Sequence, residues 1–118
     1  MVAIKFKKEF YPLIRSGVKT QTLRTPSGRV DVSPGDFAVC IFPGISDKIF
    51  VTITDVGYKY FKDLNMDDAN REGFTNVNDL KKALLEIYPA LDNSSRLYYY
   101  RFIMDGFTEL VTGDGGDV

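Results

Sequence analysis

The apolar run Phe37–Phe42 is the feature that most limits what this chain can fold into. Two segments of turn chemistry bound it, Ser33–Asp36 before it and Pro43-Gly44 after it. A run this short that is apolar on both faces is typical of a buried central strand. The next segment, Ile49–Thr54, alternates between apolar and polar residues like a half-buried strand and can continue as far as Tyr60. The chain is therefore expected to be built around a sheet.

The remaining segments add short helices and further strands to this sheet. A strand is expected over residues 3–6 and an extended stretch over residues 20–24. Between them, a short helix with Pro12 in its first turn ends at Gly17. Asn65 and Asn76 are suited to cap two later helices, and a long strand rich in tyrosine follows over residues 96–104. This order predicts an α+β fold, with a small barrel or strongly curved mixed sheet and helices at its ends.

Length and composition indicate one small globular domain. With 118 residues, 44% of them hydrophobic and 26% charged, the chain can form a single hydrophobic core. We place that domain at residues 1–105 and an acidic, glycine-rich tail at residues 106–118. No apolar run approaches the roughly 20 residues of a membrane helix, and no export leader is evident, so a cytoplasmic location is expected.

The absence of histidine and the single cysteine limit the chemistry. Ser-His-Asp and Cys-His catalysis are excluded, an internal disulfide is impossible, and neither a metal nor another cofactor is expected. Cys40 lies within the apolar run and is expected to be a small core residue. Any catalysis must come from Lys, Arg, Glu, Asp, Thr, Ser or Tyr.

Charge is distributed unevenly, although the formal net charge is only −1. Residues 1–29 hold seven basic residues and one acidic residue, whereas the remainder holds eight basic and 15 acidic residues. A basic segment on an acidic protein indicates a local anionic ligand, and not a wide nucleic-acid footprint. The alternative is that these charges are solvated and scattered over several faces.

Gly17–Arg24 is the segment with the clearest chemical potential. A glycine after a helix allows the chain to reverse, and alternation then places Thr20, Thr22 and Arg24 on one face, with Lys19 at the entrance. A cation, hydroxyls and a guanidinium can together hold a phosphate, a carbonyl oxygen or a developing oxyanion. By itself, the segment can equally be a helix end with ordinary surface Lys and Arg residues.

Taken in order, several short motifs along the chain resemble the ASCH family, a branch of the PUA-like barrels. Gly17, Lys19, Thr20, Thr22 and Arg24 fit its Gly-x-Lys-Thr-x-Thr-x-Arg pattern. The later matches, which extend the resemblance over about residues 3–104, are Pro34-Gly35-Asp36, Thr54-Asp55-Val56, Ala69-Asn70-Arg71-Glu72-Gly73-Phe74, Tyr88-Pro89 and Tyr100-Arg101-Phe102. The resemblance implies a PUA-like barrel whose cleft faces the Gly-x-Lys segment.

The resemblance also implies a function and its residues. ASCH domains in general resemble RNA-associated modules, and a compact bacterial subgroup hydrolyses N4-acetylcytidine to cytidine and acetate. By motif position, Lys19 is then the base, Thr22 the nucleophile and Glu72 the proton donor, with substrate contacts from Gly17, Thr20 and Arg24. The expected ligand is a modified nucleoside or RNA.

Other interpretations of the same residues remain open at this point. Lys19 can simply bind phosphate, Thr22 can be an ordinary strand residue, and Glu72 can cap a helix or pair with Arg71 or Lys62. The protein can then be a non-catalytic RNA-binding module, or a metal-independent ribonuclease. Tyr98, Tyr100 and Phe102 are expected to face the core, with Tyr99 outward.

The catalytic interpretation makes a structural prediction. Lys19, Thr22, Arg24 and Glu72 are expected to border one cleft, although Glu72 lies some 50 positions further along the chain. The Thr22 hydroxyl and the Lys19 amine are expected to lie within about 4 Å of each other or to be bridged by water. A structure with Glu72 on the opposite side of the barrel would contradict the catalytic assignment and leave the fold unaffected.

Overall fold

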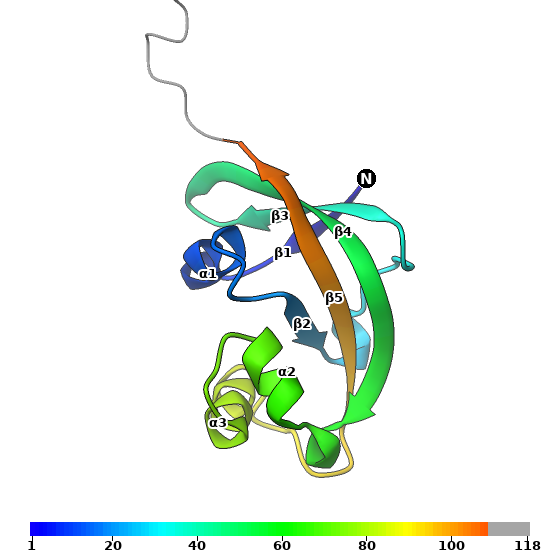
Figure 1. Ribbon diagram of the computed structural model, residues 1–118. Coiled ribbons are helices and arrows are strands. Elements are labelled where there is room, and N and C mark those ends of the chain that lie inside the picture. The colour runs from blue at the N-terminus through cyan, green and yellow to red at the C-terminus, as the bar shows by residue number, and fades with distance from the viewer. Residues whose placement is uncertain (109–118) are drawn as a thin grey trace, which may run out of the picture.

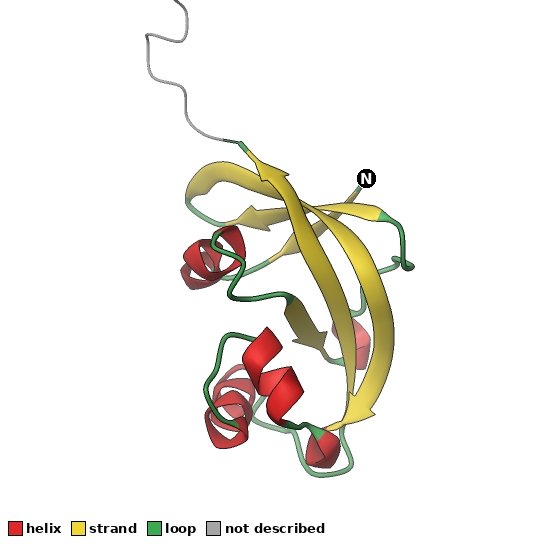
Figure 2. Ribbon diagram, viewed as in Figure 1, coloured by secondary structure: helices red, strands yellow, loops and turns green. Residues whose placement is uncertain are grey.

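A five-stranded mixed sheet dominates the computed structural model, which describes residues 1–108 (Figure 1). The strand order is β1-β3-β4-β5-β2, and only β1 and β3 run parallel. The sheet curls strongly (Figure 2). The strands are β1 (Val2–Lys5), β2 (Gln21–Arg24), β3 (Phe37–Phe42), β4 (Ile45–Tyr60) and β5 (Arg96–Phe107). This is the α+β arrangement predicted from the sequence.

The long ribbon of β4 and β5 gives the sheet its curvature. The register between the two strands shifts between Phe50 and Val51 and again between Ile53 and Asp55. Such irregularities increase the local bend and twist of a strand pair. β4 runs unbroken to Tyr60, and β5 extends two residues beyond the predicted domain boundary at residue 105. Residues 109–118 of the predicted tail lie outside the described part of the chain.

The helices are short and begin where the sequence predicts. They are α1 (Tyr11–Arg15), α2 (Met66–Arg71) and α3 (Val77–Ile87), together with the 3-10 turns η1 (Lys8–Phe10), η2 (Pro26–Gly28) and η3 (Phe61–Asp63). Asn65 caps α2 by accepting from the backbone N–H of Asp68, and Asn76 caps α3 by accepting from that of Asp79. None of the helices within residues 1–108 is long and apolar enough to cross a membrane.

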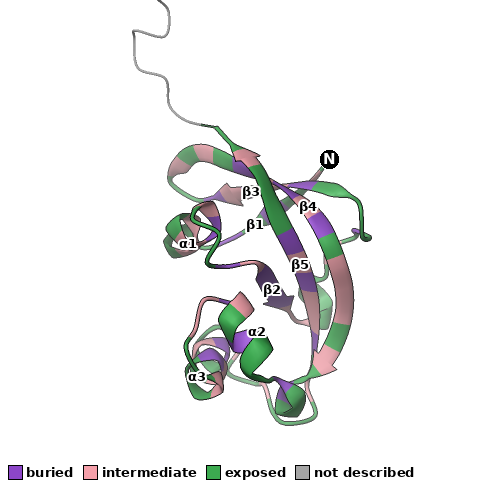
Figure 3. Cartoon of the chain, viewed as in Figure 1, coloured by how far each residue is buried: buried purple, intermediate pink, exposed green. Residues whose placement is uncertain are grey.

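Two hydrophobic clusters fill the interior. Figure 3 shows where the buried residues lie along the chain. The first lies where the sheet wraps α1 and includes Ile4, Ile14, Cys40, Ile53 and Phe102. The second joins the sheet to α2 and α3 and includes Leu23, Ala69, Leu80, Leu84 and Leu97. The sheet therefore has apolar side chains on both faces, and each face is covered by different elements.

Burial departs from the sequence prediction in two places. β3 is buried on one face only, because Phe37 is 63% exposed and only alternate residues of the strand reach the core. Tyr99 is not an outward residue, since it packs against the second cluster and its ring lies across Gly57 of the neighbouring strand. By contrast, Cys40, Tyr100 and Phe102 are buried, as predicted.

α1 ends in a Schellman motif, in which two backbone N–H groups close the last turn. Val18 donates to the carbonyl of Leu13 at 2.9 Å, and Gly17 donates to the carbonyl of Ile14 at 3.1 Å. Gly17 has φ +80°, a conformation that glycine adopts without the steric cost of a Cβ atom. The motif directs the chain from the end of α1 toward Lys19 and β2.

α2 ends in the same way. Phe74 donates to the carbonyl of Ala69 at 2.8 Å, Gly73 donates to that of Asn70 at 3.1 Å, and Gly73 has φ +93°. This explains the Glu-Gly-Phe part of the sequence motif, because the residue just before the left-handed glycine is Glu72.

The two helix ends contact each other directly. A Cβ at Gly73 would lie 3.6 Å from Val18 and 3.8 Å from Leu13, both part of the other motif. The N–H of Thr20 donates to the carbonyl of Arg71 at 2.7 Å. Segments some 50 residues apart in the sequence are thereby held in one arrangement.

We expect Gly17→Ala and Gly73→Ala each to lower the free energy of unfolding by roughly 1–2 kcal/mol, because alanine is strained at positive φ. Gly106→Ala is the matched control, since Gly106 has no positive φ and a Cβ there would meet nothing within 4 Å. Urea unfolding followed by tyrosine fluorescence measures all three. Equal stability of the three variants would contradict the proposed role of the left-handed glycines.

Candidate functional site

Lys19 is a buried cation in contact with a buried carboxylate. Its side chain is only 4% exposed, and its Nζ donates to Glu72 Oε1 at 2.7 Å. The same Nζ lies 4.8 Å from the ring centre of Phe10. Lys19 is therefore inside the cleft, and not at its entrance as the alternation pattern predicts, because the turn at Gly17 redirects the chain before β2 begins.

Glu72 is held by α2 and is 5% exposed. Burial raises the pKa of its carboxyl, while the adjacent Lys19 opposes that shift. Within residues 1–108, neither Arg71 nor Lys62, the partners considered from the sequence, forms an ion pair with Glu72. Arg71 pairs with Asp67 instead, at 2.9 Å. Glu72 thus pairs with Lys19 in a part of the protein from which water is largely excluded.

A buried polar network anchors α2 and thereby Glu72. Asp68, one helical turn before Glu72, is fully buried and accepts from Lys59 Nζ at 2.8 Å and from Gln21 Nε2 at 3.2 Å. Arg101 Nε donates to Gln21 Oε1 at 2.9 Å. Neither Gln21 nor Arg101 is a predicted site residue. The sequence gives one signal for a role of Gln21, which is strand alternation. Alternation places the Gln21 side chain on the face of β2 opposite Thr22.

Thr22 and Arg24 reach the cleft from β2. Thr22 is buried, and Arg24 lies two residues further on, on the same face of the strand. Arg24 Nη2 donates to the backbone carbonyl of Lys5 at 2.6 Å, and its guanidinium lies 5.2 Å from the ring centre of Phe6. Burial lowers the pKa of Arg24. The guanidinium is thus fixed in place by β1 and the residue that follows it.

These four side chains line one cleft of about 180 Å³, as expected from the sequence. Two phenylalanines and part of α3 form its apolar wall. The full lining is Lys5, Phe6, Lys7, Phe10, Lys19, Thr22, Leu23, Arg24, Glu72, Leu84, Ile87 and Tyr88. Sites that enclose drug-sized ligands typically measure roughly 300–1,000 Å³, so this one suits a single planar group.

The other two predicted binding residues are not among those lining the cleft. Gly17 shapes the turn that leads to Lys19, and Thr20 contributes backbone hydrogen bonds to Arg71 and to Phe102. Gly17 and Thr20 therefore position the residues of the cleft through the backbone and do not border the cleft themselves.

Two buried polar atoms of the cleft residues lack a hydrogen-bond partner within the described chain. They are Glu72 Oε2 and Arg24 Nε. Buried polar groups are nearly always hydrogen-bonded, so this carboxylate oxygen and this N–H are the positions at which a bound ligand or a water molecule would form hydrogen bonds. Such a ligand offers a polar N–H or O–H to Glu72 and a lone pair to Arg24.

Comparison with known proteins identifies the fold. Neither the family models nor the curated proteins give a match to this sequence. Among solved structures, an ASCH domain from Lactobacillus crispatus superposes with a TM-score of 0.74 at 16% identity, covering 87% of this chain and 78% of that one. A point mutant of ZmASCH from Zymomonas mobilis superposes with a TM-score of 0.61 at 16% identity, over 92% of this chain and 74% of that one. The chain therefore has the fold of ASCH domains, an α+β fold of the PUA-like type.

The raised pKa of Glu72 predicts how stability depends on pH. The folded state holds this proton more tightly than the unfolded state, in which the pKa has its ordinary value of 4.5. The contribution of the protonated Glu72 carboxyl to the free energy of unfolding is therefore complete below pH 4.5, and it is lost as the pH rises through the folded-state pKa. We expect wild type to lose stability relative to Glu72→Gln over this window, by at most about 1.4 kcal/mol per pH unit.

Urea unfolding of both proteins between pH 4 and pH 7 measures this difference, in which the titration of the other carboxyl groups largely cancels. A difference that grows in favour of wild type as the pH rises would show that attraction to Lys19 outweighs burial, and would contradict the raised pKa.

Proposed function

We propose that this protein hydrolyses the amide of N4-acetylcytidine, giving cytidine and acetate, with Lys19, Thr22 and Glu72 as its catalytic residues. The observation that carries the proposal is the buried Lys19–Glu72 pair, 2.7 Å apart, in a cleft that also contains Thr22. A base, a hydroxyl nucleophile and a carboxyl proton donor are the groups that acyl transfer requires.

The Lys19–Glu72 contact supplies the required protonation states. The ion pair becomes a neutral amine and a neutral carboxylic acid when one proton moves along the 2.7 Å hydrogen bond. Exclusion of water penalises the charged form of the Glu72 carboxyl and so favours its protonated form. The raised pKa of Glu72 is a shift in the direction that a proton donor needs.

Acylation then uses both partners of the pair. The Thr22 hydroxyl oxygen attacks the acetyl carbonyl carbon, and its proton passes to the Lys19 amine. The tetrahedral intermediate collapses as the bond between the acetyl carbon and N4 breaks, and the Glu72 carboxyl delivers its proton to N4. Cytidine leaves, the acetyl group remains as an ester on Thr22, and Lys19 and Glu72 form the ion pair.

Deacylation restores the starting state. Water attacks the ester carbon and gives its proton to the Glu72 carboxylate, while the departing Thr22 oxygen takes the proton held by Lys19. Acetic acid forms and ionises in solution. The cycle consumes one water molecule and returns the pair to its neutral form.

Arg24 and the apolar walls would hold the substrate during these steps. The free Nε–H of Arg24 can donate to a carbonyl oxygen of the ligand, and its charge favours the oxyanion of the tetrahedral intermediate. The pyrimidine ring would lie between the phenylalanines and the α3 side of the cleft, where a volume of about 180 Å³ admits one base.

A cleft that binds a base without hydrolysing it is the second candidate function, and the same unpaired atoms of Glu72 and Arg24 would serve it. The protein would then be an RNA-binding module. Lys19→Ala would be its most damaging change, because a positive charge contributes more to binding RNA than a transferable proton does.

Substitutions separate these functions. We expect Thr22→Ala to abolish hydrolysis of N4-acetylcytidine, and Glu72→Gln to lower kcat by a factor of about 10² or more while substrate still binds. Thr54→Ala is the matched control, because Thr54 is an exposed residue of β4 that is not among the residues lining the cleft. Chromatography of the cytidine released measures turnover of all four proteins.

Wild-type turnover in both Thr22→Ala and Glu72→Gln would exclude this mechanism. An equal loss in Thr54→Ala would show that the effect comes from the fold and not from the missing hydroxyl.

A further inference from the structure

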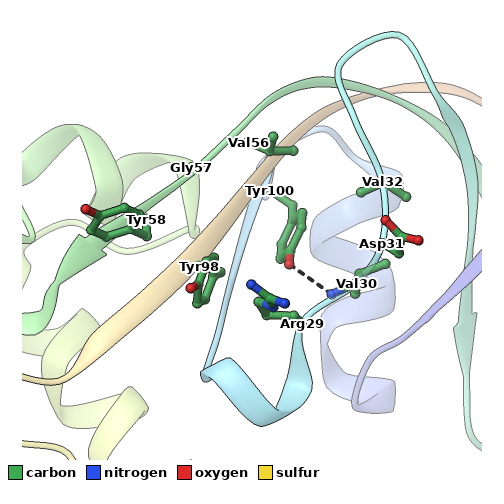
Figure 4. A pocket seen from close by; sticks show the side chains of 9 residues that line it. All are labelled: Arg29, Val30, Asp31, Val32, Val56, Gly57, Tyr58, Tyr98 and Tyr100. Atoms are coloured by element: carbon green, nitrogen blue, oxygen red, sulfur yellow. Dashed lines mark hydrogen bonds between the residues drawn. The ribbon is translucent and has the colours of Figure 1, made fainter.

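A second, larger cavity shares no lining residue with the cleft and contains none of the proposed catalytic residues. Its volume is about 640 Å³. Figure 4 shows the side chains that line it. Residues 29–32 form one side, held to the sheet by a hydrogen bond of 2.9 Å from the Val30 N–H to the Tyr100 hydroxyl. The ends of β4 and β5 form the other side, with Tyr58 and Tyr98.

Tyrosine side chains line this cavity. Tyr58 is 51% exposed, although it is a large aromatic residue in a long strand. Its ring centre lies 6.1 Å from that of Tyr98 and 6.0 Å from that of Tyr60, so three rings are grouped on one surface. Exposed aromatic faces of this kind are stacking surfaces for unpaired bases.

Two arginines flank the rings. The Arg29 guanidinium lies 5.0 Å from the centre of Tyr98, and that of Arg96 lies 4.6 Å from the centre of Tyr58. Asp31 is the one acidic residue lining the cavity. With both guanidiniums placed against the rings, the surface disfavours a cationic ligand and favours a planar ligand that carries negative charge.

The strand register connects this surface to the catalytic cleft. Arg24 of β2 pairs with Tyr98 of β5, and Tyr98 pairs with Tyr58 of β4. Directly paired residues point to the same face, with Cβ atoms about 4.5–5.5 Å apart. Arg24, Tyr98 and Tyr58 thus form one row across three strands, starting in the cleft.

A third cavity adjoins the cleft and extends as far as Arg96. Its volume is about 570 Å³, it shares Ile87 and Tyr88 with the cleft, and it includes Arg96, which contacts Tyr58. This cavity therefore brings the surroundings of the cleft to an arginine that contacts Tyr58.

We propose that Tyr58 and Tyr98, with Arg29 and Arg96, bind the neighbouring nucleotides of a single-stranded RNA whose modified cytidine occupies the cleft. Bases stack on the tyrosines, and the arginines contact the phosphates. The choice of RNA rests on the proposed function, since N4-acetylcytidine is a ribonucleoside. The substrate is then a modified residue within a strand, and not only the free nucleoside.

Binding of a fluorescein-labelled single-stranded hexaribonucleotide containing only unmodified bases, followed by anisotropy with the full chain, tests this inference. Tyr58→Ala is expected to weaken binding roughly 5- to 150-fold, the effect of losing one stacked base. Tyr58→Phe retains the ring and is expected to bind like wild type. Equal affinity of wild type and Tyr58→Ala, or no binding by wild type, would overturn the proposal.

Salt dependence tests the arginines separately. The slope of log affinity against log salt is expected to become shallower by about 0.7 in Arg96→Gln, the value for one phosphate contact on a single strand. Lys82→Gln is the matched control, because Lys82 is exposed on α3 and is not among the residues lining the three cavities. An unchanged slope in Arg96→Gln, or an equal change in Lys82→Gln, would contradict the phosphate contact.

These measurements do not depend on turnover, so the two proposals can fail separately. RNA binding that depends on Tyr58, without hydrolysis of N4-acetylcytidine, would support the nucleotide surface and contradict the enzyme. Hydrolysis of the nucleoside by a protein that does not bind the hexamer would support the enzyme and contradict the surface.

Discussion

The contact between Lys19 and Glu72 is the interaction on which the rest of this site depends. Removing two charged groups from water costs several kcal/mol for each ion, and a single ion pair seldom recovers the whole cost. A protein that needed only stability at this position would do as well with two apolar side chains. In the proposed function the pair has a chemical role, which is to pass one proton between an amine and a carboxyl group whose N and O atoms are 2.7 Å apart.

The fold holds this pair by joining two helix ends. Both helices end at a glycine in the left-handed conformation, and the two ends pack together at Gly73 and Val18. The hydrogen bond from Thr20 to the Arg71 carbonyl closes the junction. β2 then begins at once, with one face turned to the cleft and the other to the buried network of Gln21 and Asp68. The position of Glu72 is therefore determined by contacts on both sides of the sheet.

Local chemistry in the sequence predicts much of this arrangement. Pro12, Gly17 and Asn65 mark helix ends through backbone constraints that hold in any fold, and alternation in β2 predicts that Thr22 and Arg24 share a face. Only the resemblance to a known family predicts that Glu72 lies in the same cleft as Lys19. No local pattern in the sequence predicts this. Long-range packing was not predictable: the one-sided burial of β3, the place of Tyr99 against the second cluster, and the network around Arg101 depend on which elements cover each face. The burial of Lys19 is likewise not predictable from the sequence, because it follows from the packing of one helix end on another.

Cleavage of an amide bond is the activity proposed for this cleft. Incubation of N4-acetylcytidine with a small molar fraction of the full chain, followed by proton NMR, tests this claim most directly. The predicted result is the appearance of cytidine and acetate in equal amounts, over many turnovers per protein molecule. Unchanged N4-acetylcytidine in the presence of folded protein would contradict it.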